Sequence, residues 1–215
     1  PILVNECKFL NADVILVIDA SGSITAPIFN THTKNFAKEF IDRFPVGFDR
    51  TRMGIVAYAA SVYTTVDLDE CYDRECLKDR IDGLTYPAGG TCTGDAIGKA
   101  TEMFDGLDDD RPKVIVVITD GHEECGGGAS TVPSRCSAAR SKGIELFAVA
   151  VGTDTFLTKP PAIADLNAIS NSQDDRKFIA KDYESLDYTF VDNLQREVCT
   201  TTTTTIITGG KGGQC

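Results

Sequence analysis

Two apolar runs in this sequence each lead to an aspartate, and hydroxyl residues follow shortly after the first of them. Asp19 closes the run DVILVID, and Asp120 follows the run KVIVVIT. Because ligands of parallel sheets bind beyond the carboxyl ends of the strands, the two carboxylates are expected to meet at one edge of a sheet. Two carboxylates that lose hydration together repel each other, so either one takes up a proton or a cation lies between them.

The hydroxyl residues near these aspartates favour the cation. The loop DASGS, which starts at Asp19, places Ser21 and Ser23 on the same side of a tight turn, and a glycine-rich stretch adds Thr91 and Thr93. A site of carboxylates, hydroxyls and water is an all-oxygen site, which suits Mg²⁺ or Mn²⁺ in octahedral geometry, with Ca²⁺ less favoured. Neutral hydroxyl ligands leave the ion with positive charge. An Asp or Glu carboxylate of a partner could then complete its coordination shell.

Each of these pieces also has an ordinary structural explanation. The serine loop could be a turn with a helix N-cap, and Thr93 is expected to cap a helix that begins near Gly94. The dipeptide Asp120-Gly121 is a common way to end a strand. The joint occurrence of D-x-S-x-S, T-x-T-G and T-D-G in this order favours the metal site over three separate explanations.

The elements that must position these residues alternate between strands and helices. Uninterrupted apolar runs predict strands buried on both faces, and apolar residues at helical spacing predict helices. Strands are expected at 13–19, 52–58, 61–66, 113–119, 144–151 and, as an edge strand, 177–180. Helices are expected at 27–44, 75–84, 94–104, 132–142, 162–169 and 184–198. This order predicts an α/β fold with a mostly parallel sheet covered on both faces, in which 52–58 and 61–66 form an antiparallel pair.

Composition limits the classes of function. The 215 residues fit one large α/β domain, and no apolar run approaches the roughly 20 residues that cross a bilayer. A formal net charge of -11 argues against nucleic acid as a partner, because phosphate binding needs a cationic face. Eight cysteines without a CxxC spacing indicate disulfides in a secreted protein, and the presence of only two histidines argues against a zinc site.

Two other classes of function compete with a binding module. The acidic surface could act by itself in a structural or biomineral matrix protein. A metal-dependent hydrolase is less favoured, because the segment at Asp19 lacks the D-x-D of aspartyl-phosphate enzymes and the chain has neither a G-x-S-x-G elbow nor a P-loop. We therefore expect that the chain is not an enzyme.

Five segments carry a resemblance to a known family: DVILVIDASGSI, TRMGIVAYA, GGTCTGDAI, KVIVVITDG and GIELFAVAVG. They resemble successive signatures of the von Willebrand factor type A domain, in the style of the matrilin and collagen VI kind, over about residues 13–198. The resemblance implies a Rossmann-like, doubly wound sheet with one antiparallel edge strand and a metal-ion-dependent adhesion site. The implied ligands are Asp19, Ser21, Ser23, Thr91 and Asp120. Both aspartates would act partly through bound water, and the family's usual choice of the first threonine favours Thr91 over Thr93.

The resemblance also implies a function. The chain would be a secreted adhesion or matrix-assembly module that binds an extracellular protein offering Asp or Glu, such as collagen or another matrix protein. Membrane insertion is not expected, and self-association stays open. The sequence departs from the family pattern after Asp120, where the insert 122–130 (HEECGGGAS) would lie beside the metal. That insert could shape the choice of partner or block a flat, collagen-like ligand.

The terminal cysteines suggest how the domain is bounded. Cys7 and Cys199 flank it closely, as terminal cysteines do in many secreted members of the family, so we predict that they pair. Their bond would tie an N-terminal segment, 1–12, to the domain at 13–199. Residues 200–215 are rich in threonine and glycine, which predicts a flexible linker or tail.

The internal cysteines are expected to close local loops. Cys71 is close to Cys76 in the sequence, and we predict that these two pair. Cys125 is expected to pair with Cys136 within and just after the insert. A bond between Cys92 and Cys125 across the metal face is the open alternative.

Overall fold

The structure is a computed structural model that describes residues 11–107, 110–125, 131–152 and 159–209, with side chains as far as Thr200. Cys7 and Cys215 lie outside these residues, and so does the expected pairing of Cys7. Cys199 itself is disulfide-bonded. No helix in the described part of the chain is both long and apolar enough to span a membrane.

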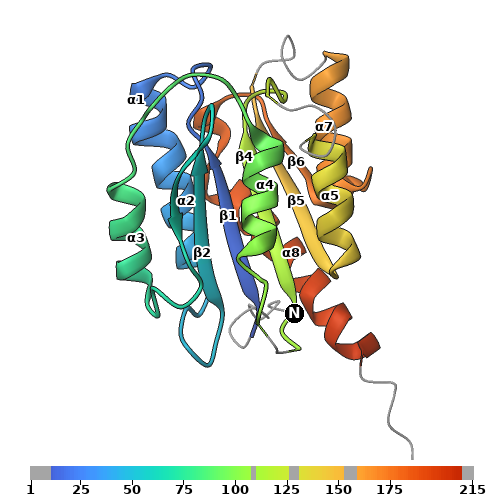
Figure 1. Cartoon of the computed structure of the whole chain (residues 1–215). Coiled ribbons are helices and arrows are strands. Elements are labelled where there is room, and N and C mark those ends of the chain that lie inside the picture. Colours follow the sequence, from blue (N-terminus) through green and yellow to red (C-terminus); the bar gives the residue numbers. More distant parts are fainter. Residues whose placement is uncertain (1–10, 108–109, 126–130, 153–158, 210–215) are drawn as a thin grey trace, which may run out of the picture.

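A six-stranded sheet forms the centre of the molecule, with strand order β3-β2-β1-β4-β5-β6 (Figure 1). Its strands are β1 (Asp13–Asp19), β2 (Arg52–Tyr58), β3 (Val62–Val66), β4 (Lys113–Thr119), β5 (Ile144–Val151) and β6 (Lys177–Ala180). Strand β3 pairs antiparallel with β2, and every other neighbouring pair is parallel. The sequence prediction of a mostly parallel sheet with one antiparallel edge strand is confirmed.

Helices cover both faces of the sheet (Figure 1). Side chains of β1 alternate between two cores: Leu16 packs on one face and Ile15 on the other. The first core includes residues of α2 (Lys34–Asp42), α3 (Arg74–Asp82) and α8 (Tyr188–Gly209). The second includes residues of α4 (Thr93–Glu102), α5 (Val132–Ser141) and α7 (Pro160–Ser170). Burial on both sides explains why the central strands are apolar without alternation.

The first expected helix, 27–44, is divided in the structure. It consists of α1 (Ala26–Ile28), a π-helical turn η2 (Phe29–Thr33) and α2. Apolar spacing predicts that a segment is helical, but it does not reveal a local change of the hydrogen-bond pattern from i+4 to i+5.

The closing helix also differs from the prediction. Two short 3₁₀ turns, η4 (Asp174–Arg176) and η5 (Tyr183–Ser185), precede it, and α8 begins at Tyr188 rather than near residue 184. Helix α8 then continues to Gly209, so it crosses the boundary expected at residue 200. At this boundary the hydroxyl of Thr200 donates to the carbonyl oxygen of Arg196 at 2.9 Å, a bond that a threonine inside a helix commonly makes.

A buried ion pair lies at the opposite end of β1 from Asp19. The carboxylate of Asp13 is fully buried and accepts hydrogen bonds from Nε and Nη2 of Arg52, at 2.7 and 2.6 Å. Two parallel bonds between a guanidinium and a carboxylate are the geometry in which such a pair is strongest. This pair joins the first residues of β1 and β2, far along the strand from the candidate site.

Candidate metal centre

Asp19 occupies the last position of β1 and is fully buried. Its Oδ1 accepts a hydrogen bond from the backbone N–H of Ser21 at 2.8 Å, and its Oδ2 accepts one from the hydroxyl of Thr119 at 2.7 Å. Thr119 is the last residue of β4, the strand that pairs with β1. The carboxylate of Asp19 therefore bridges the ends of two adjacent strands.

The two serines connect Asp19 to Asp120. Their hydroxyl oxygens, Ser21 Oγ and Ser23 Oγ, are 3.0 Å apart, and Ser23 Oγ donates to Asp120 Oδ1 at 2.6 Å. Ser21 is buried, whereas Ser23 is exposed. Four of the five predicted ligands thus form one continuous polar chain at the carboxyl ends of β1 and β4.

The loop that carries Ser21 and Ser23, called the serine loop, is held by a close backbone approach against the glycine-rich loop that carries Gly89 and Thr91. The N–H of Gly22 donates to the carbonyl oxygen of Gly89 at 2.8 Å, and a Cβ at position 22 would lie 3.1 Å from that oxygen. Gly89 has φ of +100°, a conformation that favours glycine. The hydroxyl of Tyr86 also donates to the carbonyl oxygens of Ser21 and Ile24. The turn of the serine loop is therefore fixed from several sides.

Thr91, the fifth predicted ligand, lies on the glycine-rich loop and faces the same region. A Cβ built on Gly121 would be 3.8 Å from Thr91 Oγ1 and 3.9 Å from Ser23 Oγ, so both hydroxyls flank the residue after Asp120. A cavity of about 250 Å³ opens here, and its lining includes Ser23, Thr91 and Glu124. The structure therefore brings all five predicted residues to one place.

Thr93 takes a different position from Thr91. It is the first residue of α4, and its hydroxyl lies 2.9 Å from the hydroxyl of the buried Tyr58. Cys92, not Thr93, occupies the N-cap position, and it makes no side-chain cap bond. The prediction that Thr93 caps this helix is wrong, because its side chain points to a buried tyrosine instead of the first turn.

The electrostatics of the two aspartates favour a positive partner. Burial raises the pKa of Asp19, although hydrogen bonds from Ser21 and Thr119 oppose the rise. Burial raises the pKa of Asp120 to about 7, and the negative charge of Asp19 adds to the increase. A divalent ion among these groups would offset both effects. Carboxylates and hydroxyls are also the hard oxygen donors that Mg²⁺ and Mn²⁺ prefer, so the residues present fit such an ion.

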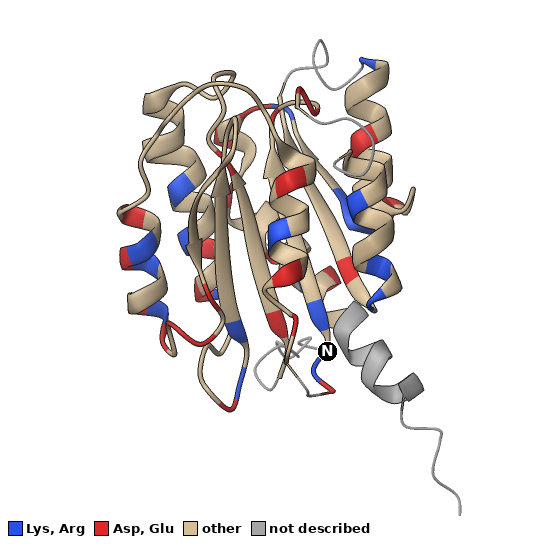
Figure 2. Cartoon of the chain, in the orientation of Figure 1, with Lys and Arg blue, Asp and Glu red and all other residues tan. Residues whose placement is uncertain are grey.

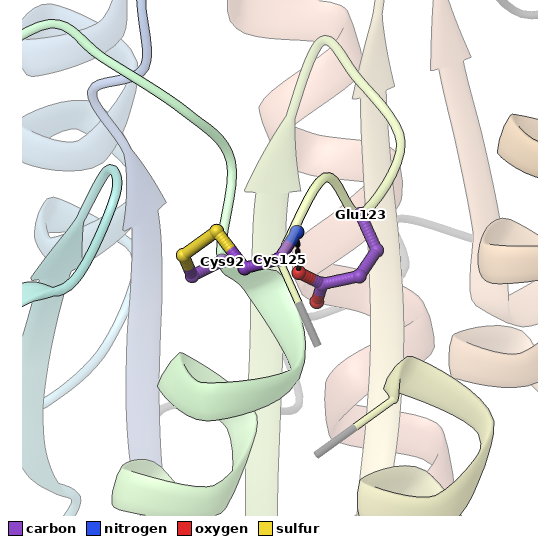
Figure 3. Close-up of side chains that lie close together, drawn as sticks. All are labelled: Cys92, Glu123 and Cys125. Carbon is purple, nitrogen blue, oxygen red and sulfur yellow. Dashed lines mark hydrogen bonds between the residues drawn. A yellow bond between two sulfur atoms is a disulfide. The ribbon is translucent and has the colours of Figure 1, made fainter. Parts of the chain in front are cut away.

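A disulfide ties two loops of this site together. Cys92, next to Thr91, bonds to Cys125 in the loop after β4, with their Cα atoms 4.9 Å apart (Figure 3). The predicted pairing of Cys125 with Cys136 is wrong, and the open alternative is correct. Cys136 lies on α5 as a fully buried free thiol. It packs in the core between the sheet and helices α4, α5 and α7.

The other local disulfide agrees with the prediction. Cys71 and Cys76 are bonded, with their Cα atoms 5.6 Å apart. This bond closes the loop that leads into α3, where the side chain of Asp73 caps the helix by accepting from the N–H of Cys76 at 2.8 Å.

Glu123 is a residue of this region that the sequence analysis missed. Its Oε2 accepts from the N–H of Gly94 at 2.5 Å. Its Oε1 accepts from the N–H of Cys125 at 2.8 Å, the bond drawn in Figure 3. The carboxylate therefore caps α4 from a distant loop. It also lies close to the two sulfur atoms, but these are joined to each other and offer no thiolate for a metal.

Replacing Glu123 with Ala is expected to lower the free energy of unfolding by about 1–2 kcal/mol, because two backbone N–H groups lose a charged acceptor. Chemical denaturation measures this change. The matched control is Glu124→Ala, since the side chain of Glu124 is exposed and makes no hydrogen bond or ion pair within the described residues. Equal losses in the two variants would contradict the capping role.

Comparison with known proteins places this architecture in a family. The family model of the von Willebrand factor type A domain matches residues 13–193. The chain belongs to this family. Type A relatives include the transmembrane cell adhesion receptor mua-3 of Caenorhabditis elegans, 30% identical over 200 residues that cover 90% of this chain and 5% of the receptor. They also include mouse matrilin-3, 32% identical over 67% of this chain and 30% of matrilin-3. The mouse collagen alpha-4(VI) chain is 32% identical over 65% of this chain and 6% of the collagen.

A solved structure shares the type A fold over nearly the whole chain. It is proximal thread matrix protein 1 from the mussel byssus, with a TM-score of 0.77, 27% sequence identity, and coverage of 91% of this chain and 47% of the mussel protein. That structure is described as having a zinc-occupied metal-ion-dependent adhesion site. The type A domain described here spans less than half the length of each of these proteins.

Proposed function

We propose that this domain binds a divalent cation and uses it to hold an acidic side chain of an extracellular protein. The proposed ligands are Asp19, Ser21, Ser23, Thr91 and Asp120, with both aspartates acting partly through water. The observation that carries the proposal is the polar chain that runs from Asp19 through both serines to Asp120. Asp19 is the last residue of β1, Asp120 follows β4, and both serines lie in the loop that leads from β1 to α1.

The cavity beside the polar chain supports binding of an outside carboxylate. It opens next to Ser23 and Thr91, which are two of the proposed ligands. Hydroxyl ligands carry no charge, so they leave part of the positive charge of Mg²⁺ or Mn²⁺ available to an incoming Asp or Glu. A carboxylate that enters this cavity would bind the ion directly and complete its coordination shell.

The relatives support an adhesive or matrix-assembly role in the extracellular space. Their names describe a cell adhesion receptor, a collagen chain and a thread matrix protein. Disulfides such as Cys71–Cys76 and Cys92–Cys125 suit a secreted protein. Collagen or another matrix protein that displays acidic side chains is therefore the proposed class of partner, and the domain would act by binding and not by catalysis.

Capture from an extracellular matrix extract tests this function. The immobilised domain is expected to retain matrix protein in Mg²⁺ and to release it in EDTA. Amidating the carboxyl groups of the extract beforehand is expected to abolish capture, because the ion would lose its acidic ligand. Thr91→Ala is expected to weaken capture at least about tenfold, the scale of losing a group that organises a metal site.

Thr101→Ala is the matched control for this experiment. Thr101 is at the far end of α4, and its hydroxyl donates to Ile97 within the helix. Capture that survives EDTA, amidation and Thr91→Ala would contradict the metal site. It would instead favour the acidic surface, since Asp and Glu residues are spread over the helices and loops of the domain (Figure 2).

A further inference from the structure

An acidic residue, Glu124, lies at the rim of the cavity beside the candidate metal centre. The cavity is lined by glycines, by the proposed ligands Ser23 and Thr91, and by His122 and Glu124. Glu124 is therefore the acidic residue among the described residues that line it, and its side chain is exposed. An outside carboxylate that enters this cavity to reach the ion comes close to a second negative charge.

Backbone contacts fix the place of Glu124. Its N–H donates to the carbonyl oxygen of Thr91 at 2.9 Å, and the next residue, Cys125, is bonded to Cys92. A Cβ built on Gly90 would lie 3.4 Å from Glu124 Oε2, so the carboxylate lies over the backbone next to Thr91. Glu124 is thus held beside a proposed metal ligand by contacts that do not use up its carboxylate.

The charge of this carboxylate is not compensated within the described part of the chain. The side chain of Glu124 makes no hydrogen bond or ion pair there, whereas the neighbouring Glu123 accepts from two backbone N–H groups. Glu124 also does not join Asp19 and Asp120 in one group of ligand atoms among the described residues. Its negative charge therefore stays available to a partner.

We propose that Glu124 selects partners in which a basic side chain lies next to the acidic one. This inference rests on the proposed function, because the acidic side chain is the one that the metal centre would hold. A partner that presents Asp or Glu alone brings its carboxylate towards Glu124, and like charges held close together oppose binding. A partner that also presents Lys or Arg pairs this cation with Glu124 while its acid reaches the ion. Glu124 thus adds both an attraction to one class of partner and a repulsion of the other.

Binding of synthetic peptides at saturating Mg²⁺ tests the inference. Each probe is a capped, glycine-rich peptide with a single Glu. In one set a Lys takes each neighbouring position in turn, and in the matched set Gln replaces the Lys. The best Lys peptide is expected to bind about two- to fivefold more tightly than its Gln counterpart, which is the scale of an exposed ion pair. Titration followed by nuclear magnetic resonance measures these weak affinities.

Two variants of Glu124 change the preference in different ways. Glu124→Gln is expected to abolish it, because the amide carries no charge. Glu124→Lys is expected to reverse it, so that a peptide with a second Glu in place of the Lys binds more tightly than the Lys peptide. Both variants are expected to fold, since the bond to Thr91 comes from the backbone N–H.

Glu39→Gln is the matched control. Glu39 is an exposed glutamate on α2, does not line the cavity, and makes no ion pair within the described residues. This variant changes the net charge as Glu124→Gln does, and it is expected to keep the preference for Lys. A preference that persists in Glu124→Gln, or that is lost equally in Glu39→Gln, would overturn the inference. Comparing two peptides on the same variant also cancels any change in occupancy of the ion.

EDTA separates this inference from the proposed function. If the Lys and Gln peptides bind equally well in Mg²⁺ and EDTA releases both, the metal centre stands and the role of Glu124 is refuted. If both peptides bind as tightly in EDTA as in Mg²⁺, the proposed function is refuted, and the inference falls with it.

Discussion

Replacing Asp19 with Asn is expected to remove the stabilisation of the domain by divalent cations. An ion that binds only the folded state at about 100 times its Kd adds about 2.7 kcal/mol to the free energy of unfolding. For a domain of this size each kcal/mol corresponds to about 2–4 °C in Tm, so Mg²⁺ at that concentration is expected to raise Tm by about 5–10 °C. The Asn variant is expected to show no rise, because its side chain carries no charge to hold the ion.

Asp13→Asn is the matched control for this prediction. Asp13 is on the same strand, is equally buried and undergoes the same substitution, but it pairs with Arg52 at the opposite end of β1. Its baseline Tm is expected to fall because a buried ion pair is weakened, while its rise in Mg²⁺ is retained. Differential scanning calorimetry with and without Mg²⁺ measures both quantities. A full rise in Asp19→Asn, or a lost rise in Asp13→Asn, would contradict the assignment.

Removing the Cys92–Cys125 disulfide is expected to weaken both the fold and the metal centre. The bond closes a loop with a sequence separation of 33 residues. The chain-entropy model gives about 3–4 kcal/mol of stabilisation for such a loop. Cys92→Ala with Cys125→Ala is therefore expected to lower the free energy of unfolding by about this amount, as measured by chemical denaturation. Metal affinity is expected to fall at least about tenfold, because the loop of Thr91 is no longer held against the loop after Asp120.

The Cys71–Cys76 bond offers a matched control for this double variant. Its sequence separation is 5 residues, for which the same model gives about 2 kcal/mol. Removal of this bond is expected to destabilise the domain by about that amount while metal affinity stays unchanged. Chemical denaturation gives the stability of each double variant, and a separate metal titration gives its metal affinity. If both double variants lose metal affinity equally, the loss reflects general destabilisation and the special role of Cys92–Cys125 is refuted.

The sheet could be predicted from the sequence because its central strands are buried on both faces. The observed bounds of β1 and β4 coincide with the apolar runs that end near Asp19 and Asp120. Burial leaves few polar positions in such strands, so their ends are sharply marked. The meeting of Asp19 and Asp120 at one place followed from the same signal, since parallel strands bring their carboxyl ends to one edge.

Features that depend on distant contacts could not be predicted in the same way. Cys125 is nearer in sequence to Cys136 than to Cys92, yet the fold places Cys136 in the core and Cys92 beside the loop. The capping of α4 by Glu123 likewise joins loops that lie far apart in the sequence. The place of His122 beside the cavity could likewise be seen only in the fold.

The extent of the closing helix shows a different limit. A threonine run has low intrinsic helix propensity, so the sequence after Cys199 predicts a flexible segment. In the structure α8 continues through this run to Gly209. Hydrogen bonds within a helix that has already formed can extend it past residues that would not start one, because propagation is far easier than nucleation.

Crystals of the domain soaked in Mn²⁺ and measured at the manganese absorption edge give the most direct test of the metal centre. A single anomalous peak is expected beyond the ends of β1 and β4, within about 2.1 Å of the hydroxyl oxygens of Ser21, Ser23 and Thr91. Asp19 and Asp120 are expected to reach the ion directly or through one water. A map in which these hydroxyls point elsewhere, with no anomalous peak between the two aspartates, would contradict the account.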